Sequence, residues 1–250
     1  MHDDQRLRPT LWAITAQVVC LGLITAVLSS SRAAAAQEDA TIDARAETQS
    51  LIVSPQKRAS FSGEPASKDV RQVADWVVDS GDNQSLPFVI VDKMDAKVFV
   101  FDKEGRLNGA APALLGLARG DDSAPGIGDR ALSQISPEER TTPAGRFVAA
   151  LGNDLGEQDI LWVDYDAAIS LHRVITTSPK DRRLQRLATP SVLDNRISYG
   201  CINVPVKFYE SIVRPAFIGT NGIVYILPET RSIRDVFPGF TAPALGLSSR

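Results

Sequence analysis

The residue most able to do chemistry in this chain is Cys201, which follows Gly200 and precedes Pro205 by four positions. We expect Pro205 to begin a helix, because proline is favoured at the first helical position. A thiol just before a helix start, beside backbone N–H groups, is stabilised as the thiolate, and the same N–H groups could bind an oxyanion. The glycine lets the backbone approach closely, so the thiol can be presented rather than buried. This pattern indicates a nucleophilic cysteine.

The N-terminus predicts export. Residues 1–36 place Arg6 and Arg8 before an uncharged, largely apolar run over 11–28 and end in small residues at Ala36. This is the layout of a secretory signal peptide. An uncleaved membrane anchor is the alternative, because about 18 apolar residues are enough to span a bilayer.

Cleavage after residue 36 would remove His2 and Cys20, so that Cys201 and His172 become the single cysteine and the single histidine. A lone thiol cannot form an internal disulfide, and an unpaired cysteine in an oxidising compartment calls for an explanation. His172 is then the one histidine available as a general base. The alternative is a buried, inert cysteine, and the separation in sequence says nothing about distance in space.

The charge balance excludes some partners. The chain has 27 basic and 30 acidic residues, a net charge of −3, and the leader removes three arginines against two aspartates. This mild acidity speaks against nucleic acid or an anionic membrane surface as the main partner.

By composition and pattern we expect a linker over 37–66, a docking helix and connector over 67–85, a catalytic domain over 86–229 and a C-terminal tail over 230–250.

The remaining signals are mainly β. Short β-branched and aromatic runs separated by turn residues predict a sandwich or a barrel with one or two short helices. The expected strands are 88–91, 97–101, 111–115, 147–151, 160–164, 168–172 and 223–227, with helices over 67–79 and from Pro205. The segment 116–128, with its glycines and aspartates, lacks the spacing of a calcium or phosphate loop and is expected to be a flexible rim.

Three ordered segments resemble the L,D-transpeptidase, or YkuD, catalytic domain family. His172 is followed after a loop by Ser-Tyr-Gly-Cys-Ile-Asn over 198–203, where the family has Ser/Thr-His-Gly-Cys, a hydrophobic residue and Asn or Arg. The segment 142–147 matches the family's Thr-Pro-x-Gly-x-Phe, and 90–102 matches its opening strand pair. Tyr199 departs from the family's second histidine, and the loop before Ser198 is longer than usual.

The resemblance implies a YkuD-like β-sandwich that transfers acyl groups on peptidoglycan stem peptides outside the cytoplasm, as a monomer without metal or organic cofactor. Cys201 would attack the carbonyl of the third residue of a tetrapeptide stem, with His172 moving the protons. The N–H groups of Tyr199, Gly200 and Cys201 would bind the oxyanion. The remaining candidates are Ser198 and Asn203 for support of the loop, and Arg196, Arg182, Arg183 and Arg186 for substrate binding.

Three alternatives remain open. The acyl group could pass to water, as in an L,D-carboxypeptidase or a cross-link hydrolase, or the fold could be a non-catalytic peptidoglycan-binding module, as Tyr199 suggests. The basic segment 176–189 is expected to form a mobile flap that draws in the carboxylates of the stem, because its positive charge lies in an otherwise acidic protein; a solvated surface is the alternative.

Overall fold

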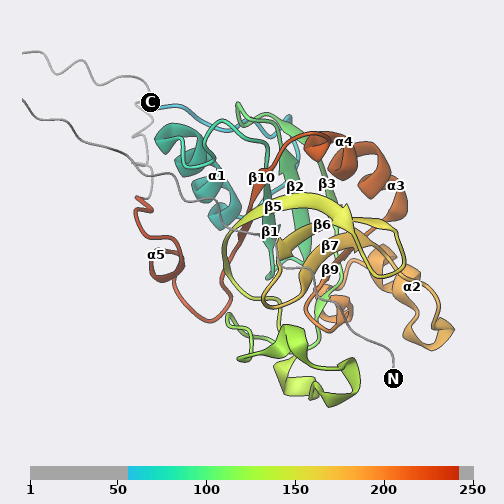
Figure 1. Cartoon of the computed structure of the whole chain (residues 1–250). Coiled ribbons are helices and arrows are strands. Elements are labelled where there is room, and N and C mark those ends of the chain that lie inside the picture. Colours follow the sequence, from blue (N-terminus) through green and yellow to red (C-terminus); the bar gives the residue numbers. More distant parts are fainter. Residues whose placement is uncertain (1–55, 242–250) are drawn as a thin grey trace, which may run out of the picture. The chain divides into compact units, whose positions relative to one another are not determined.

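The computed structural model describes residues 56–241, and the leader, its anchor alternative and most of the expected linker lie outside this range (Figure 1). Within it, the strands form an eight-stranded sheet in the order β3-β2-β1-β10-β5-β6-β7-β9 and a two-stranded sheet of β4 and β8. The strands are β1 (Phe88–Asp92), β2 (Lys97–Phe101), β3 (Leu107–Pro112), β4 (Leu115–Gly116), β5 (Gly145–Asn153), β6 (Asp159–Asp164), β7 (Ile169–Arg173), β8 (Arg196–Ser198), β9 (Ile202–Val204) and β10 (Gly222–Ile226).

The helices are short and lie outside the sheet. The longest, α1 (Lys68–Ser80), begins where the hydroxyl of Ser67 accepts a hydrogen bond from the N–H of Val70, and it ends at Gly81 in the left-handed conformation. The others are α2 (Arg183–Ala188), α3 (Val206–Phe208), a π-helical turn (Tyr209–Val213), α4 (Arg214–Phe217) and α5 (Ile233–Val236). None of the helices described here is long and apolar enough to cross a bilayer.

Two apolar cores use the two faces of the sheet. Alternate residues of β1, β2 and β10 pack with α1 and α5 on one side. On the other side, β1, β2 and β10 share a common core with β5, β6, β7 and β9. Tyr209, Val213 and Phe217 of the helices after β9 complete this core. In Figure 1, β5, β6, β7 and β9 cross in front of β1, β2 and β10, so the long sheet folds over this core as a sandwich. The expected mainly β fold is confirmed.

Three details of the expected fold are wrong. The third strand is β3, Leu107–Pro112, which overlaps the expected run 111–115 only at its last two residues, and Leu115 of that run lies in β4. The helix predicted from Pro205 begins at Val206, and strand β9 separates it from Cys201, so this thiol does not lie at a helix start. The segment 116–128 is not simply a flexible rim, because the side chain of Asp121 within it is completely buried.

Candidate active site

Two neighbouring parallel strands bring His172 and Cys201 together. In the register of β7 with β9, Leu171 pairs with Ile202 and His172 pairs with Asn203. Leu171 and Ile202 are fully buried in the core. Because side chains alternate along a strand, His172 and Asn203 point to the opposite face, as does Cys201 directly before β9. The pairing therefore joins residues that the long connection over 173–200 separates in sequence.

The orientation of His172 leaves one ring nitrogen free to act as a base. Its Nδ1 lies 2.7 Å from the carbonyl oxygen of Arg173. A carbonyl can only accept, so Nδ1 must carry the proton in this contact, which makes Nε2 the unprotonated nitrogen of the neutral ring. The backbone thus selects the tautomer that a general base at Nε2 requires.

The environment of Cys201 favours its thiolate. Ser170 donates a hydrogen bond to the sulfur at 3.6 Å, and the thiol donates to the carbonyl of Ala168 at 3.5 Å. Burial raises the pKa of the Cys201 thiol, but a hydrogen bond and an electrostatic interaction with His172, together with the hydrogen bonds of Ser170, outweigh it and leave the pKa below its ordinary value. The thiol is therefore activated by its neighbours across the strand and not by a helix.

The turn before the thiol is held by two hydroxyl groups. The Ser198 hydroxyl accepts a hydrogen bond from Gly200 N–H at 3.1 Å and donates to the Cys201 carbonyl at 2.6 Å. The buried Thr142 hydroxyl accepts from Gly116 N–H and donates to the Gly200 carbonyl, both at 2.8 Å. The turn is thereby tied to itself and to the segment before β5.

These contacts decide which N–H groups can bind an oxyanion. The N–H of Gly200 is already bonded to Ser198, whereas no hydrogen bond between residues 56 and 241 is donated by the N–H of Tyr199 or Cys201. In a trans peptide the C=O and N–H point in opposite directions. By holding the Gly200 carbonyl, Thr142 fixes the direction of the Cys201 N–H. The geometry leaves two of the three expected donors available.

The ring of Tyr199 packs against a cationic side chain. The guanidinium of Arg140 lies over its ring, 4.0 Å from the centroid, which is a cation–π arrangement. Arg140 also donates to the carbonyl of Ile135. A protonated imidazole at position 199 would be repelled by this guanidinium, so the neighbouring arginine suits the neutral phenol.

Asn203 connects the site to helix α2. Its amide donates to the Cys201 carbonyl at 3.3 Å, and its Oδ1 accepts from Arg183 at 2.9 Å. Arg183 also pairs with Asp181 at 3.0 Å. Arg183 is therefore linked through Asn203 to the backbone of Cys201.

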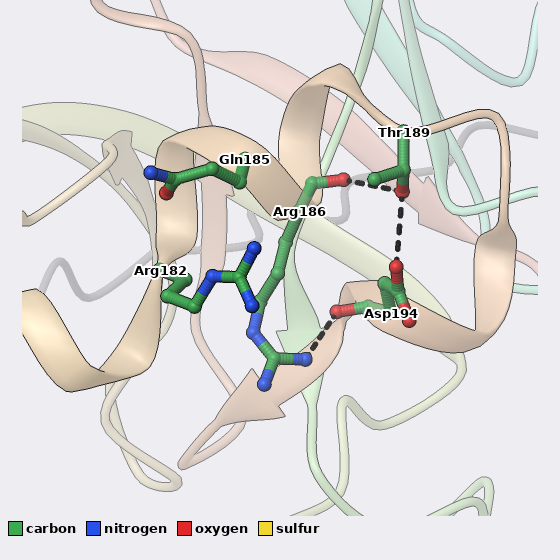
Figure 2. Close-up of a pocket in the computed structure, with 5 residues that line it drawn as sticks. All are labelled: Arg182, Gln185, Arg186, Thr189 and Asp194. Atoms are coloured by element: carbon green, nitrogen blue, oxygen red, sulfur yellow. Dashed lines mark hydrogen bonds between the residues drawn. The ribbon is translucent and has the colours of Figure 1, made fainter.

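The other two arginines of this segment line a pocket of about 150 Å³ with Gln185, Thr189 and Asp194 (Figure 2). Arg186 is tied to the backbone there: it donates to the carbonyls of Asp181 at 2.7 Å and Asp194 at 2.8 Å. Arg182 is exposed. The expected flap is thus a helical segment braced by two of its own arginines, and Arg182 is the one whose charge is open to a ligand.

The side chain of Arg196 belongs to a buried charge cluster. It forms a two-pronged pair with Glu229, at 3.1 and 2.6 Å, and donates to the Lys93 carbonyl at 2.9 Å. Lys93 in turn bonds to Asp121 at 2.7 Å, and neither of their side chains is exposed. Arg196 is the first residue of β8, so the cluster holds the strand that leads into the catalytic turn.

Two residues of the site were not expected from the sequence. Ser170 could have been found, because it is two positions before His172 on the same face of a predicted strand. Thr142 stands in the Thr-Pro-x-Gly-x-Phe segment, but nothing in that pattern indicates that its hydroxyl reaches the turn before Cys201.

Comparison with known proteins adds a resemblance of shape. No family model matches the chain, and no curated protein matches it. Three solved structures, each 13% identical, are similar: the LD transpeptidase LdtMt1 in complex with imipenem, an L,D-transpeptidase from Xylanimonas cellulosilytica, and a mutant L,D-transpeptidase from Enterococcus faecium. Their TM-scores are 0.32, 0.34 and 0.30, over 56%, 57% and 56% of this chain.

The matched region spans 58%, 60% and 49% of the length of those three chains. At this identity and these TM-scores, the likeness supports no conclusion about what this chain does. The assignment of chemistry must come from the site itself.

Proposed function

We propose that the chain is a cysteine acyltransferase of the L,D-transpeptidase type, acting outside the cytoplasm on peptidoglycan stem peptides. The observation that carries the proposal is the placement of Cys201, directly before β9, beside His172 on the adjacent parallel strand β7, with the thiol pKa lowered by that histidine. The substrate class comes from the resemblance of residues 142–147 and 198–203 to that family.

The proposed reaction uses the residues placed at this site. The thiol proton passes to Nε2 of His172 as the sulfur attacks the carbonyl carbon of the third stem residue. The oxyanion accepts hydrogen bonds from the N–H groups of Tyr199 and Cys201, each worth a few kcal/mol. The C–N bond then breaks, and His172 returns its proton to the departing terminal residue, leaving a thioester on Cys201.

The second half restores the enzyme. An amine of a neighbouring stem attacks the thioester carbon, its proton passes to Nε2 of His172, and the C–S bond breaks to give the new amide and the thiol. Water in place of the amine would give hydrolysis with the same two residues. The products formed from purified muropeptides distinguish the two outcomes.

The direct test is the intact mass of the full chain after incubation with a tetrapeptide muropeptide. The wild type should gain the mass of the muropeptide minus that of the released terminal amino acid, and Cys201→Ala should gain none and show no turnover. Labelling of wild type by a carbapenem would separate an enzyme from a binding module. Turnover by Cys201→Ala, or no adduct with either reagent, would contradict the proposal.

The role of His172 is tested by alkylation of the thiol across pH. Because the histidine lowers the pKa of Cys201, His172→Ala should move the iodoacetamide rate profile to higher pH and slow the reaction near pH 7. Turnover should fall by about 10²–10⁴-fold, as for loss of a general base. Equal alkylation profiles would show that the two residues are not paired.

A further inference from the structure

An exposed aromatic pair shares the sheet face of the thiol. Trp162 and Tyr165 are stacked, with ring centroids 4.7 Å apart and planes 21° from parallel, and Tyr165 is 66% exposed. The neighbours of Trp162 in β6, Leu161 and Val163, belong to the core, so Trp162 points to the outer face. Packing of the core does not account for an indole at this position.

The strand register places this pair beside the active site. Trp162 pairs with Ser170, and directly opposed residues of antiparallel strands share a face. Ser170 in turn contacts the sulfur of Cys201. Neighbouring strands lie about 4.8 Å apart, so the backbone of Trp162 is two strand spacings, about 10 Å, from that of Cys201.

The glycine at position 152 gives the two rings room to lie across the sheet. A side chain at Gly152 would meet Trp162 Cδ1 at 2.8 Å and the Tyr165 hydroxyl at 3.5 Å. The absence of that side chain leaves room for the indole over β5, where its Nε1 reaches the Asn153 carbonyl at 3.4 Å. The result is a flat aromatic platform, made of Trp162 and Tyr165, with an open outer ring.

The acidic residues around the platform determine which kind of ligand can bind there. The segment 154–168 contains five acidic residues and no basic one. Asp159 is paired with Arg173 and Arg214, and the other four form no ion pair with a basic side chain among the described residues. Their uncompensated charge repels a carboxylate-bearing stem peptide but not a neutral ring. The C–H face of a pyranose suits the negative face of an aromatic ring, and its hydroxyls can bond to carboxylates at the edge.

We propose that the Trp162–Tyr165 platform is a subsite for a pyranose ring, the glycan sugar to which the stem peptide is attached. This rests on the proposed function and names a second part of its substrate. The length of the stem fits this placement. Three extended residues, from the sugar-linked end to the attacked third residue, span about 10 Å, which matches the separation between the backbones of Trp162 and Cys201. The platform would thus distinguish a stem on its glycan from a free peptide.

The test measures binding to the full chain carrying Cys201→Ala, so that no acyl transfer intervenes. A peptide-free β-1,4-linked N-acetylglucosamine trisaccharide is titrated by calorimetry, with Tyr165→Ala and Trp162→Ala added in turn. We expect each to weaken binding about two- to tenfold, the loss of one aromatic contact. Trp162→Phe should retain most of it. Ile218→Ala, which trims another side chain that is 57% exposed, is the matched control and should bind normally.

A second titration compares a disaccharide-tetrapeptide with the same peptide lacking sugar. The sugar should tighten binding, and Tyr165→Ala should abolish that gain. No trisaccharide binding at millimolar concentration, binding unaltered by the platform variants, or equal weakening for both peptides would overturn the subsite. Because binding is read without chemistry, trisaccharide binding would survive a failure of the acyl-transfer proposal, so the two are distinguishable.

Discussion

At the scale of single residues, Thr142 sets the direction of a catalytic group that it does not touch. Its hydroxyl is completely buried and uses both its hydrogen-bonding roles, with Gly116 N–H and the Gly200 carbonyl. The peptide between Gly200 and Cys201 is rigid, so holding its oxygen aims its N–H. A residue far from the thiol in sequence thereby prepares the site for negative charge.

Thr142→Val keeps the shape of the side chain but leaves a buried donor and a buried acceptor without a partner. We expect a loss of roughly 1–3 kcal/mol in the free energy of unfolding. We also expect kcat to fall about tenfold or more with KM little changed, short of the 10²–10³-fold cost of removing an oxyanion donor outright. Thr142→Ser should restore kcat. A kcat of the valine variant equal to wild type would show that the hydroxyl does not orient the turn.

At the scale of elements, the turn between β8 and β9 demands glycine at position 200. Gly200 has φ +132°, and a side chain there would lie 2.7 Å from both the Thr141 carbonyl oxygen and Ile169 Cδ1. Gly200→Ala should therefore displace the turn and lower kcat by about 10²-fold, the effect of a shift near 1 Å. Activity close to wild type would mean that the turn tolerates the displacement.

Gly219→Ala is the matched control for that variant. Gly219 also has positive φ, at +72°, but nothing lies within 4 Å of the added side chain. Only the backbone strain of about 1–2 kcal/mol should appear, in the thermal midpoint, with kcat unchanged.

The arginines at helix α2 are expected to differ in role: one stabilises the fold and another binds substrate. Arg186 donates to two main-chain carbonyls, so Arg186→Gln should lower the free energy of unfolding by roughly 1–3 kcal/mol. The exposed Arg182 should instead affect substrate binding: Arg182→Gln is expected to raise KM about two- to fivefold at low salt and less at high salt, with kcat unchanged. Thermal melts and steady-state kinetics read the two effects, and an unaltered KM at low salt would make Arg182 a solvated surface residue.

The sequence could predict elements whose signal is local. The apolar and β-branched runs of β1, β2, β5, β6, β7 and β10 and the apolar face of α1 are visible in their own residues. Strands β8 and β9 have three residues each and exist through their partners, β4 and β7, so no window of sequence reveals them. For the same reason, Cys201 and His172 could be nominated by type, but their contact depends on a pairing that only the fold supplies.

At the scale of the whole molecule, one buried charge cluster ties distant segments together. Lys93 after β1, Asp121 before β5, Arg196 in β8 and Glu229 after β10 bond to one another or to the adjoining backbone. The sequence gives no sign of this, because aspartate among glycines usually indicates a solvated turn. Its members are far apart in the chain, and only folding makes them neighbours.

The acid stability of the protein should therefore depend on Asp121. Burial alone would raise the pKa of Asp121, but hydrogen bonds from Lys93, Thr230 and the N–H of Glu229 lower it far below its ordinary value. A carboxyl with a depressed folded pKa stabilises the fold above its unfolded pKa, near 4, and that stability is lost as pH falls below it. Urea midpoints of wild type should fall steeply from about pH 5 downward.

Asp121→Asn should remove much of that dependence. At pH 7 it should cost roughly 3–5 kcal/mol, because Lys93 stays buried and loses its closest charged partner. The adjacent Asp122 is the matched control: it is 79% exposed and pairs with Arg231 at the surface, so Asp122→Asn should change stability by about 0.5 kcal/mol or less. Urea titrations of the three proteins between pH 3 and pH 7 measure both effects. If Asp121→Asn loses stability toward acid as steeply as wild type, other carboxylates control acid unfolding and the cluster is not its cause.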